Sequence, residues 1–288
     1  MNSLAAAVVI PAHNEEQVIG ACLEALDAAR DDGLEVEVIV VANGCTDGTA
    51  DVARQYPDVR VIEQDEPSKR LALDTGDAAA TRFPRIFLDA DIRLGSGALR
   101  QLVAALSVPE PRVGSPTVRF DMTGASVSVR SFYRAFEQLP YVRHHLIGLG
   151  VYGLSEQGRA RFDRFPEVVA DDLFIQRLFA DEERVVVPGE FWVRVPRDLR
   201  NLLKVRTRVA RGNSELAGIA TDDDEGRFAG STGATGRALR DLARSEPARI
   251  PDVAVYVAVT LAARLRARRA AARGRSAWER DDSSRAAG

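Results

Sequence analysis

The chain has 288 residues, 45% of them apolar and 28% charged, which is enough for one large domain or two small ones around a buried core. Its 39 basic and 42 acidic residues leave a formal net charge of −3, and no basic stretch is interleaved with stacking aromatic residues. Both facts argue against a nucleic-acid partner. Two cysteines do not make a disulfide framework. We therefore expect a cytoplasmic protein without a signal peptide or a membrane-spanning helix.

Strand and helix signals alternate over residues 1–110. The first apolar run, residues 4–10, is typical of a strand buried on both faces. A helix is expected to follow with Asn14 as its N-cap. In chain order we then predict strand 36–41, helix 47–56, strand 59–62, helix 68–80, strand 86–88 and helix 97–106. Short loops between alternating strands and helices predict an α/β fold with a mostly parallel sheet covered on both faces.

The second half of the chain is less regular. Helices are expected at 128–139 and 171–179, short strands at 184–188 and 191–195, and a C-terminal helix at 249–272. Residues 218–248 begin with Gly, Thr, Ser and Asp and are predicted to be a flexible linker, and the tail 273–288 is predicted to be disordered. The domain is thus expected to span residues 1–217, in halves 1–110 and 111–217.

Polar residues follow three of the predicted strands, where open parallel sheets bind ligands. Residues 11–15 read Pro-Ala-His-Asn-Glu, and residues 43–49 read Asn-Gly-Cys-Thr-Asp-Gly-Thr. For the second segment alone, ordinary turn chemistry is the better interpretation. In Asp89-Ala90-Asp91 both carboxylates point to one side of an extended chain, an arrangement that suits Mg²⁺ or Mn²⁺ beside a phosphate. Such a triplet is often accidental, but its place after a buried strand favours a metal site.

Two further groups have both a functional and a purely structural interpretation. Asp171 and Asp172 begin a predicted helix, so they either cap it or supply a general base. Arg208 and Arg211 share a helix face, so they either clamp a diphosphate or are simply solvated.

Together these motifs resemble the family-2 glycosyltransferases, inverting enzymes of the GT-A fold that use nucleotide-sugar donors. The likeness rests on four segments in the family's order: residues 9–16, residues 43–49, Asp89-Ala90-Asp91 and Ala170-Asp171-Asp172. It is strong over residues 4–106, fair to about residue 212 and absent beyond. It implies that 1–110 is the nucleotide-binding half and 111–217 the acceptor half.

The resemblance also implies a role for individual residues. Asp172 matches the family's general base, and Asp91 its metal ligand. Gly153 and Asp171 would contact the acceptor. The donor nucleotide would be bound by Pro11, Ala12, His13, Glu15, Asn43, Lys69, Asp89, Ala90, Asp91, Arg208 and Arg211.

Three departures from the family pattern bear on these roles. Asn43 stands where an aspartate often reads the base, which makes uracil a less secure assignment. Gly212 replaces a tryptophan of the processive synthases. Some relatives use a histidine late in the chain as a metal ligand. This chain has no counterpart to it, because its three histidines are His13, His144 and His145 and none of them comes later than residue 145.

We therefore expect metal-assisted transfer of one sugar, with inversion, to a small-molecule or lipid-linked acceptor. A UDP-sugar is the favoured donor, with GDP- and TDP-sugars as alternatives.

A nucleotidyltransferase of similar fold and a catalytically inactive nucleotide-sugar-binding protein are the alternative functions. A nucleotidyltransferase usually has a glycine-rich loop after the first strand, and this chain does not. A NAD-dependent dehydrogenase fits less well, because no G-x-G-x-x-G follows the first strand.

The C-terminal segment 253–269 is apolar at its start and rich in arginine at its end. Its apolar residues are mainly alanine and valine, so we favour a helix packed on its own domain or on a second subunit of a homodimer. The alternative is an interfacial anchor that places the enzyme peripherally at the inner membrane face.

Overall fold

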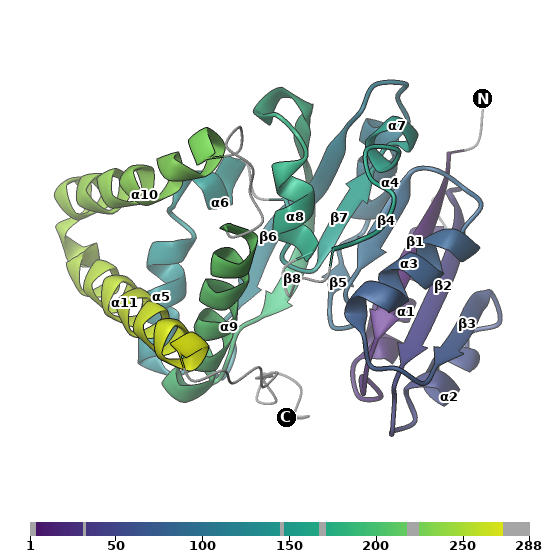
Figure 1. The fold of residues 1–288 in the computed structure, drawn as a ribbon, viewed down its shortest axis with the longest axis horizontal. Helices are drawn as coiled ribbons and strands as arrows, with labels where there is room; N and C mark the ends of the chain where they lie inside the picture. The colour runs from purple at the N-terminus through teal and green to yellow at the C-terminus, as the bar shows by residue number, and fades with distance from the viewer. Residues whose placement is uncertain (1–3, 31–32, 145–146, 167–170, 218–224, 273–288) are drawn as a thin grey trace.

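The computed structural model describes residues 4–30, 33–144, 147–166, 171–217 and 225–272 (Figure 1). Within them an eight-stranded mixed sheet runs in the order β3-β2-β1-β4-β7-β6-β8-β5. The strands are β1 Ala5–Ala12, β2 Glu35–Asn43, β3 Val59–Gln64, β4 Arg85–Leu88, β5 Arg93–Leu94, β6 Val113–Asp121, β7 Val151–Leu154 and β8 Arg184–Arg194. The expected α/β class is confirmed.

The first half is the predicted alternation of parallel strands and helices. β3, β2, β1 and β4 pair in parallel, so their carboxyl ends lie at one edge. Successive β1 residues face opposite sides, and both faces are covered. One core contains Val8 and Ile10 with α1 (Ile19–Arg30), α2 (Thr49–Arg54) and α4 (Ala98–Leu106). The other contains Ala7 and Val9 with α3 (Lys69–Ala79) and α8 (Asp171–Arg177). Burial on both faces explains the apolar sequence of β1.

Helix starts in this half agree with the sequence in one case and differ in another. Ser68, the first residue of the predicted helix 68–80, caps α3 and accepts a hydrogen bond from the Leu71 amide. Asn14 does not cap α1, which begins only at Ile19. Asn14 has φ +54°, and its side-chain oxygen accepts a hydrogen bond from the Thr46 amide at 2.8 Å. The residue therefore joins the loop after β1 to the loop after β2, a tertiary contact that outweighs local capping.

The second half adds β7 antiparallel to β4 and β6 antiparallel to β7. Two short strands were predicted over 184–195, and the structure has one strand, β8, with a register shift where Pro188 and Gly189 interrupt its pairing with β6. A Cβ at Gly189 would lie 2.5 Å from the Cα of Ala98, so glycine allows α4 to pack there. β6 and β7 are not among the predicted strands.

Helices α5 (Val127–Phe136), α9 (Leu199–Ala217), α10 (Glu225–Ser245) and α11 (Ile250–Ala272) form a separate cluster beside the sheet (Figure 1). Their shared core is aromatic: the Phe132 and Tyr256 rings stack at 5.0 Å between centroids. The short helices α6 (Pro140–His144) and α7 (Glu156–Arg159) complete the described helices of four or more residues. This helical region is defined here as α5, α9, α10 and α11.

The predicted linker 218–248 is wrong for most of its length, because α10 occupies Glu225–Ser245. Leu239 of α10 packs into the helical region's core and Leu242 is also buried, and a Gly- and Ser-rich composition gives no sign of this packing. Over the predicted C-terminal helix 249–272 the structure has α11, Ile250–Ala272. The tail 273–288 lies outside the described residues. Among the described residues, none of the helices is both apolar enough and long enough to cross a bilayer.

Candidate active site

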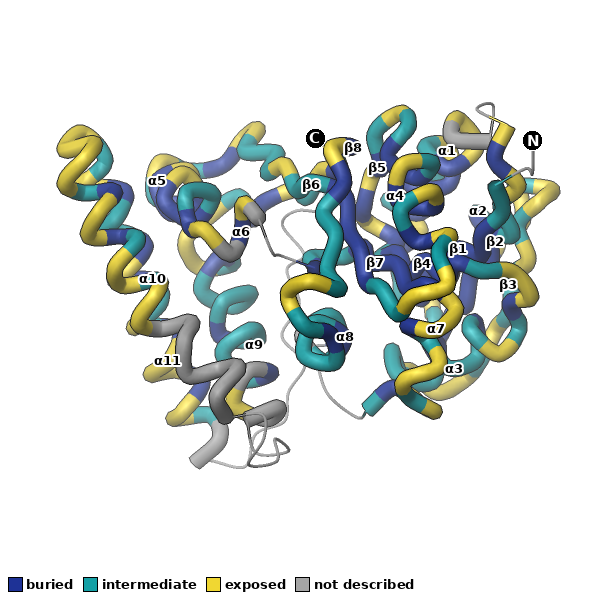
Figure 2. Tube along the Cα trace, turned by 90° about the horizontal axis from the view of Figure 1, so that it is seen from above, coloured by how far each residue is buried: buried dark blue, intermediate teal, exposed yellow. Residues whose placement is uncertain are grey.

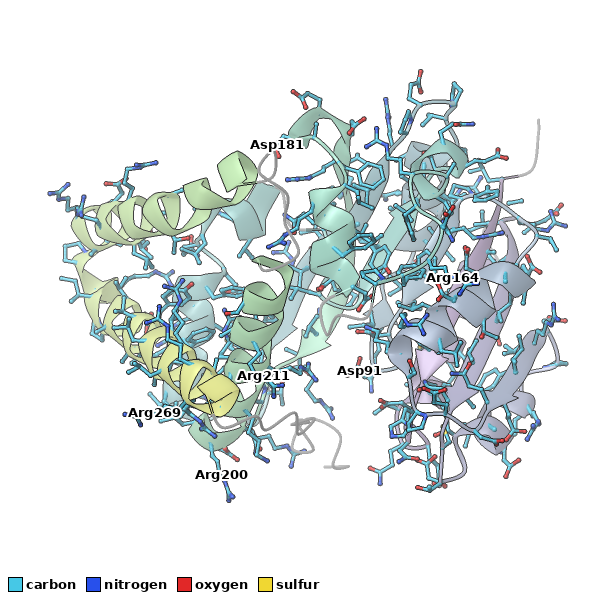
Figure 3. The ribbon with its side chains drawn as sticks, viewed as in Figure 1. Asp91, Arg164, Asp181, Arg200, Arg211 and Arg269 are labelled. Carbon is cyan, nitrogen blue, oxygen red and sulfur yellow. The ribbon has the colours of Figure 1, made fainter. Side chains whose placement is uncertain are left out.

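The Asp89-Ala90-Asp91 triplet follows β4 directly, at the edge where the parallel strands end. The Asp89 amide donates to the Gly150 carbonyl at 2.7 Å, which ties the triplet to the loop before β7. Ala90 is buried, whereas Asp91 is exposed. Figure 3 shows Asp91 on the lower side of the molecule. Cys22 lies beneath, and burial raises the pKa of its thiol, with Asp91 and Asp89 adding to the rise. Two carboxylates, those of Asp89 and Asp91, therefore follow β4 at this edge of the sheet.

Lys69, the first residue of α3, joins this triplet to α8. Its Nζ lies 2.9 Å from an oxygen of Asp89 and 2.9 Å from an oxygen of Asp171. Burial alone would lower the pKa of Lys69, but Asp171 and Asp89 outweigh burial and raise it well above its ordinary value. The lysine is thus charged and neutralises two carboxylates from segments eighty residues apart in the chain.

Asp171 is held on its other side by Tyr152 of β7. The buried tyrosine hydroxyl donates to the second Asp171 oxygen at 3.2 Å. Burial raises the pKa of Tyr152 well above its ordinary value, and the negative charge of Asp171 adds to the rise. The hydroxyl therefore stays protonated and donating. Asp171 is 7% exposed and has both oxygens engaged, so it fixes the start of α8 on the sheet.

Asp172 lies beside Asp171 but in a different environment. It is half-buried, and one of its oxygens accepts a hydrogen bond from the Leu149 amide at 3.2 Å. Gly148, with φ +116°, makes room for it, because a Cβ at position 148 would lie 2.5 Å from the Asp172 Cβ. The loop 148–150 therefore packs closely on the side chain of Asp172 and orients it at the same edge of the sheet.

An open pocket of about 210 Å³ lies at the ends of β2 and β3. Its lining residues are Ala42, Gly44, Cys45, Thr46, Glu63, Gln64 and Asp65. Asn43, predicted to bind the donor nucleotide, is 4% exposed and donates to the Ala12 carbonyl at 2.8 Å. A His13 ring nitrogen lies 2.5 Å from the Asn43 carbonyl oxygen. Both side chains therefore join the two loops. Glu63, Gln64 and Asp65, at the carboxyl end of β3, were not singled out from the sequence. The search for polar residues at strand ends, which found the other segments, would have found these as well.

The remaining residues named from the sequence fall into three groups. Pro11 and Ala12 end β1 at the site edge, and Glu15 follows in the adjoining loop with its side chain buried. Arg208 and Arg211 lie half-buried on α9, and Figure 3 shows Arg211 on the same lower side as Asp91. His144 belongs to α6, but its side chain and all of His145 lie outside what the structure describes.

The structure gives both residues predicted to contact the acceptor a structural role. Gly153 lies inside β7, where a Cβ would meet Leu106 at 2.5 Å and Ile86 at 2.6 Å, so it serves the packing of α4 on the sheet. Asp171 is occupied by Lys69 and Tyr152 rather than open to an acceptor. Lys69, predicted as a nucleotide contact, is likewise engaged by two carboxylates. Tyr152 was missed as a site residue, because a buried tyrosine in an apolar strand gives no sign of its partner.

Curated relatives share short regions with the chain. It is 35% identical over 89 residues to glycosyltransferase AglE of Haloferax volcanii, which covers 29% of this chain and 29% of that protein. It is 35% identical over 102 residues to an uncharacterized glycosyltransferase of Mycobacterium tuberculosis, Rv0539, covering 35% of this chain and 44% of that protein. The chain thus matches less than half the length of either relative.

Solved structures share the fold over a longer stretch. A mannosyltransferase from Pyrobaculum calidifontis in complex with GDP-Man and Mn²⁺ superposes with a TM-score of 0.66 at 21% identity, covering 93% of this chain and 87% of that one. A glucosyl-3-phosphoglycerate synthase from Mycobacterium tuberculosis, in complex with Mn²⁺ and UDP, gives 0.51 at 21% identity over 73% of this chain and 78% of that one. These likenesses support the GT-A fold.

The family model described as glycosyl transferase family 2 matches residues 7–156. That span contains the loops after β1 and β2, the triplet after β4 and the loop 148–150 that holds Asp172. It covers more than half of the chain. The chain therefore belongs to glycosyl transferase family 2.

Proposed function

We propose that this protein transfers one sugar from a nucleotide-sugar donor to an acceptor nucleophile, with inversion at the anomeric carbon. The observation that carries the proposal is the meeting of Asp89, Lys69, Asp171 and Asp172 at the carboxyl ends of the strands. Strands, loops and α8 fix these groups before any substrate binds, and such preorganisation is what electrostatic catalysis requires. Family membership gives the reaction class, and inversion is carried over from the family.

The donor nucleoside fits the pocket after β2 and β3. The Gln64 side chain offers both a donor and an acceptor, and Glu63 and Asp65 add acceptors at the rim. Uracil and guanine both present ring N–H groups that such acceptors bind. One solved neighbour holds GDP-Man and the other UDP, so the two neighbours do not decide between these bases. A UDP-sugar or a GDP-sugar is the proposed donor class, and a TDP-sugar is included in the donor panel described below.

The donor diphosphate is proposed to lie between Asp91 and α9. Asp91 is exposed, and among the described residues no group of three His, Cys, Asp or Glu side chains converges on one point. Mg²⁺ and Mn²⁺ sites in such enzymes commonly combine one or two carboxylates with substrate phosphates, so this donor set fits either ion. Bound there, the ion supplies charge neutralisation for the leaving diphosphate. Arg208 and Arg211 are proposed to bind the phosphate oxygens from the other side.

Asp172 is proposed as the general base, and Asp171 as a positioning residue. Asp171 already accepts from Lys69 and Tyr152, so taking a proton would break both contacts. Asp172 is half-buried beside it, and one of its carboxylate oxygens accepts a hydrogen bond from the Leu149 backbone amide. Its carboxylate can take the acceptor proton while the acceptor oxygen attacks the anomeric carbon from the face opposite the diphosphate.

A donor panel tests the proposal. The chain is mixed with UDP-, GDP- or TDP-sugars in the presence of Mn²⁺ or Mg²⁺, and the melting temperature and the release of nucleoside diphosphate are followed. One nucleotide class is expected to raise the melting temperature and to be hydrolysed slowly by water. If none of the three shifts the melting temperature and none is hydrolysed, the transferase proposal is wrong. Nucleotide binding without hydrolysis or transfer would favour the inactive binding protein.

A further inference from the structure

Helix α11 exposes a row of large aliphatic side chains on one face. Ile250 is 52% exposed, Val257 40%, Leu261 54% and Leu265 53%. The steps of seven, four and four residues place all four on one side of the helix. The opposite side of α11 is buried, with Tyr256 and Ala263 packed into the helical region. We call the exposed row the α11 face.

This concentration is unusual for a folded surface. Seven large hydrophobic residues are exposed among the described residues, and four of them belong to the α11 face. Exposed aliphatic residues that are scattered singly need no explanation, but a contiguous row marks an interaction surface. In Figure 2, α11 and α10 lie at the outer end of the molecule, away from the sheet.

Arginines accompany the aliphatic row. Arg264 and Arg268 fall on the α11 face at helical spacing from Leu261 and Leu265, and both are exposed. Arg266 and Arg269 are also exposed in the last turns. The one acidic residue of α11, Asp252, lies near the opposite end and is engaged by Arg134. The carboxyl-terminal half of the helix is thus uniformly cationic.

The figures place α11 at the outside of the molecule. In Figure 1, α11 forms the lower-left outline of the ribbon.

We propose that the α11 face docks on the surface of an anionic lipid bilayer. A row of aliphatic side chains flanked by arginines is the chemistry of a helix that lies in the headgroup region, with its apolar side inserted and its guanidinium groups on lipid phosphates. A second copy of the chain is the less suitable occupant, because four half-exposed aliphatic side chains offer much less than the about 800 Å² per partner that stable dimers bury.

Flotation of the full-length chain with vesicles tests this proposal. The chain is expected to float with vesicles that contain phosphatidylglycerol at low salt, and to remain at the bottom with phosphatidylcholine alone. Leu261→Gln combined with Leu265→Gln is expected to abolish flotation. Arg264→Gln combined with Arg268→Gln is expected to weaken flotation and to reduce its dependence on salt. All four substituted side chains are exposed, so both double variants should fold, and unchanged melting temperatures check this.

Two matched controls make the result specific. Arg240→Gln combined with Arg244→Gln removes the same charge from exposed positions of α10, and Val127→Gln removes an exposed aliphatic side chain of α5. Both are expected to float like the wild type. Three results would overturn the proposal: no flotation of the wild type with anionic vesicles, equal loss in the α10 control, or a wild-type dimer that the leucine substitutions convert to monomers. The readout needs no enzymatic activity, so it stands whatever the donor panel shows.

Discussion

The sheet and the helical region use charged residues in opposite ways. At the edge of the sheet, Lys69 lies between Asp89 and Asp171, and Tyr152 satisfies the remaining Asp171 oxygen. In the helical region the arginines at the end of α11 point to solvent, and the core is built from aromatic rings. Carboxylates that take part in a reaction must be held in place by fixed partners. Arginines that bind lipid phosphates at a surface need no such partners. Substitutions in the two regions should therefore have separable effects, and the predictions below test that separation.

The largest effect is expected at Asp172. Asp172→Asn removes the proposed base and keeps the size of the side chain, so kcat should fall by about 10²–10⁴-fold while nucleotide affinity is retained. Turnover measured with the best donor of the panel checks this. Asp171→Asn is the matched comparison: it should lower the melting temperature and reduce turnover less. Near-normal turnover of Asp172→Asn, or a greater loss in Asp171→Asn, would reverse the two roles.

The second effect concerns donor binding. Asp91→Asn should weaken nucleoside diphosphate binding in the presence of Mn²⁺ by about 10–100-fold, the range that follows changes in groups supporting a metal site. Calorimetric titrations with and without Mn²⁺ measure it. The difference between wild type and variant should shrink when the metal is omitted. Equal affinities with Mn²⁺ present would remove Asp91 from the site.

The bridge at Lys69 is the third test. Lys69→Met leaves Asp89 and Asp171 facing each other without a cation, and like charges at this distance repel. The free energy of unfolding should fall by about 1–2 kcal/mol, below the value for a fully buried pair because the lysine side chain is 31% exposed. Urea unfolding measures this change. Lys69→Arg should restore part of the stability, and a Lys69→Met protein as stable as the wild type would contradict the bridging role.

The smallest effect is expected in the helical region. Hydrogen bonds from Arg134 lower the pKa of Asp252, so the folded state holds the charged carboxylate more favourably than the unfolded state does. This stability is complete above the ordinary aspartate pKa of about 3.9 and is lost as the pH falls through the lowered value in the folded state.

Asp252→Asn should therefore cost about 1 kcal/mol near neutral pH, a reduced figure because Arg134 is 44% exposed. The cost should shrink in strong acid. Asp241→Asn, at an exposed position of α10, is the control and should change little. Turnover should be unaffected by both substitutions, and a loss of turnover in Asp252→Asn would link the two regions.

The sequence predicted the parallel half well because its signals are local. An apolar run such as β1 is buried on both faces, and Ser68 caps its own helix. The rest depends on contacts between distant segments. Asn14 contacts Thr46 instead of capping α1, and α10 is held by tertiary packing, with Leu239 buried in the core of the helical region. In the candidate site, the acidic triplet after a buried strand pointed to Asp89, and the family resemblance pointed to Asp172. The partners of Lys69 and Tyr152 are set by the sheet order, which no local pattern encodes.

The central claim is that this site transfers a sugar with inversion. Nuclear magnetic resonance of the reaction products tests it most directly, using the nucleotide-sugar that raises the melting temperature most, Mn²⁺ and either water or an added acceptor. We predict nucleoside diphosphate together with a sugar whose anomeric configuration is opposite to that of the donor. A sugar phosphate with nucleoside monophosphate, or a sugar that retains the donor's configuration, would contradict the account.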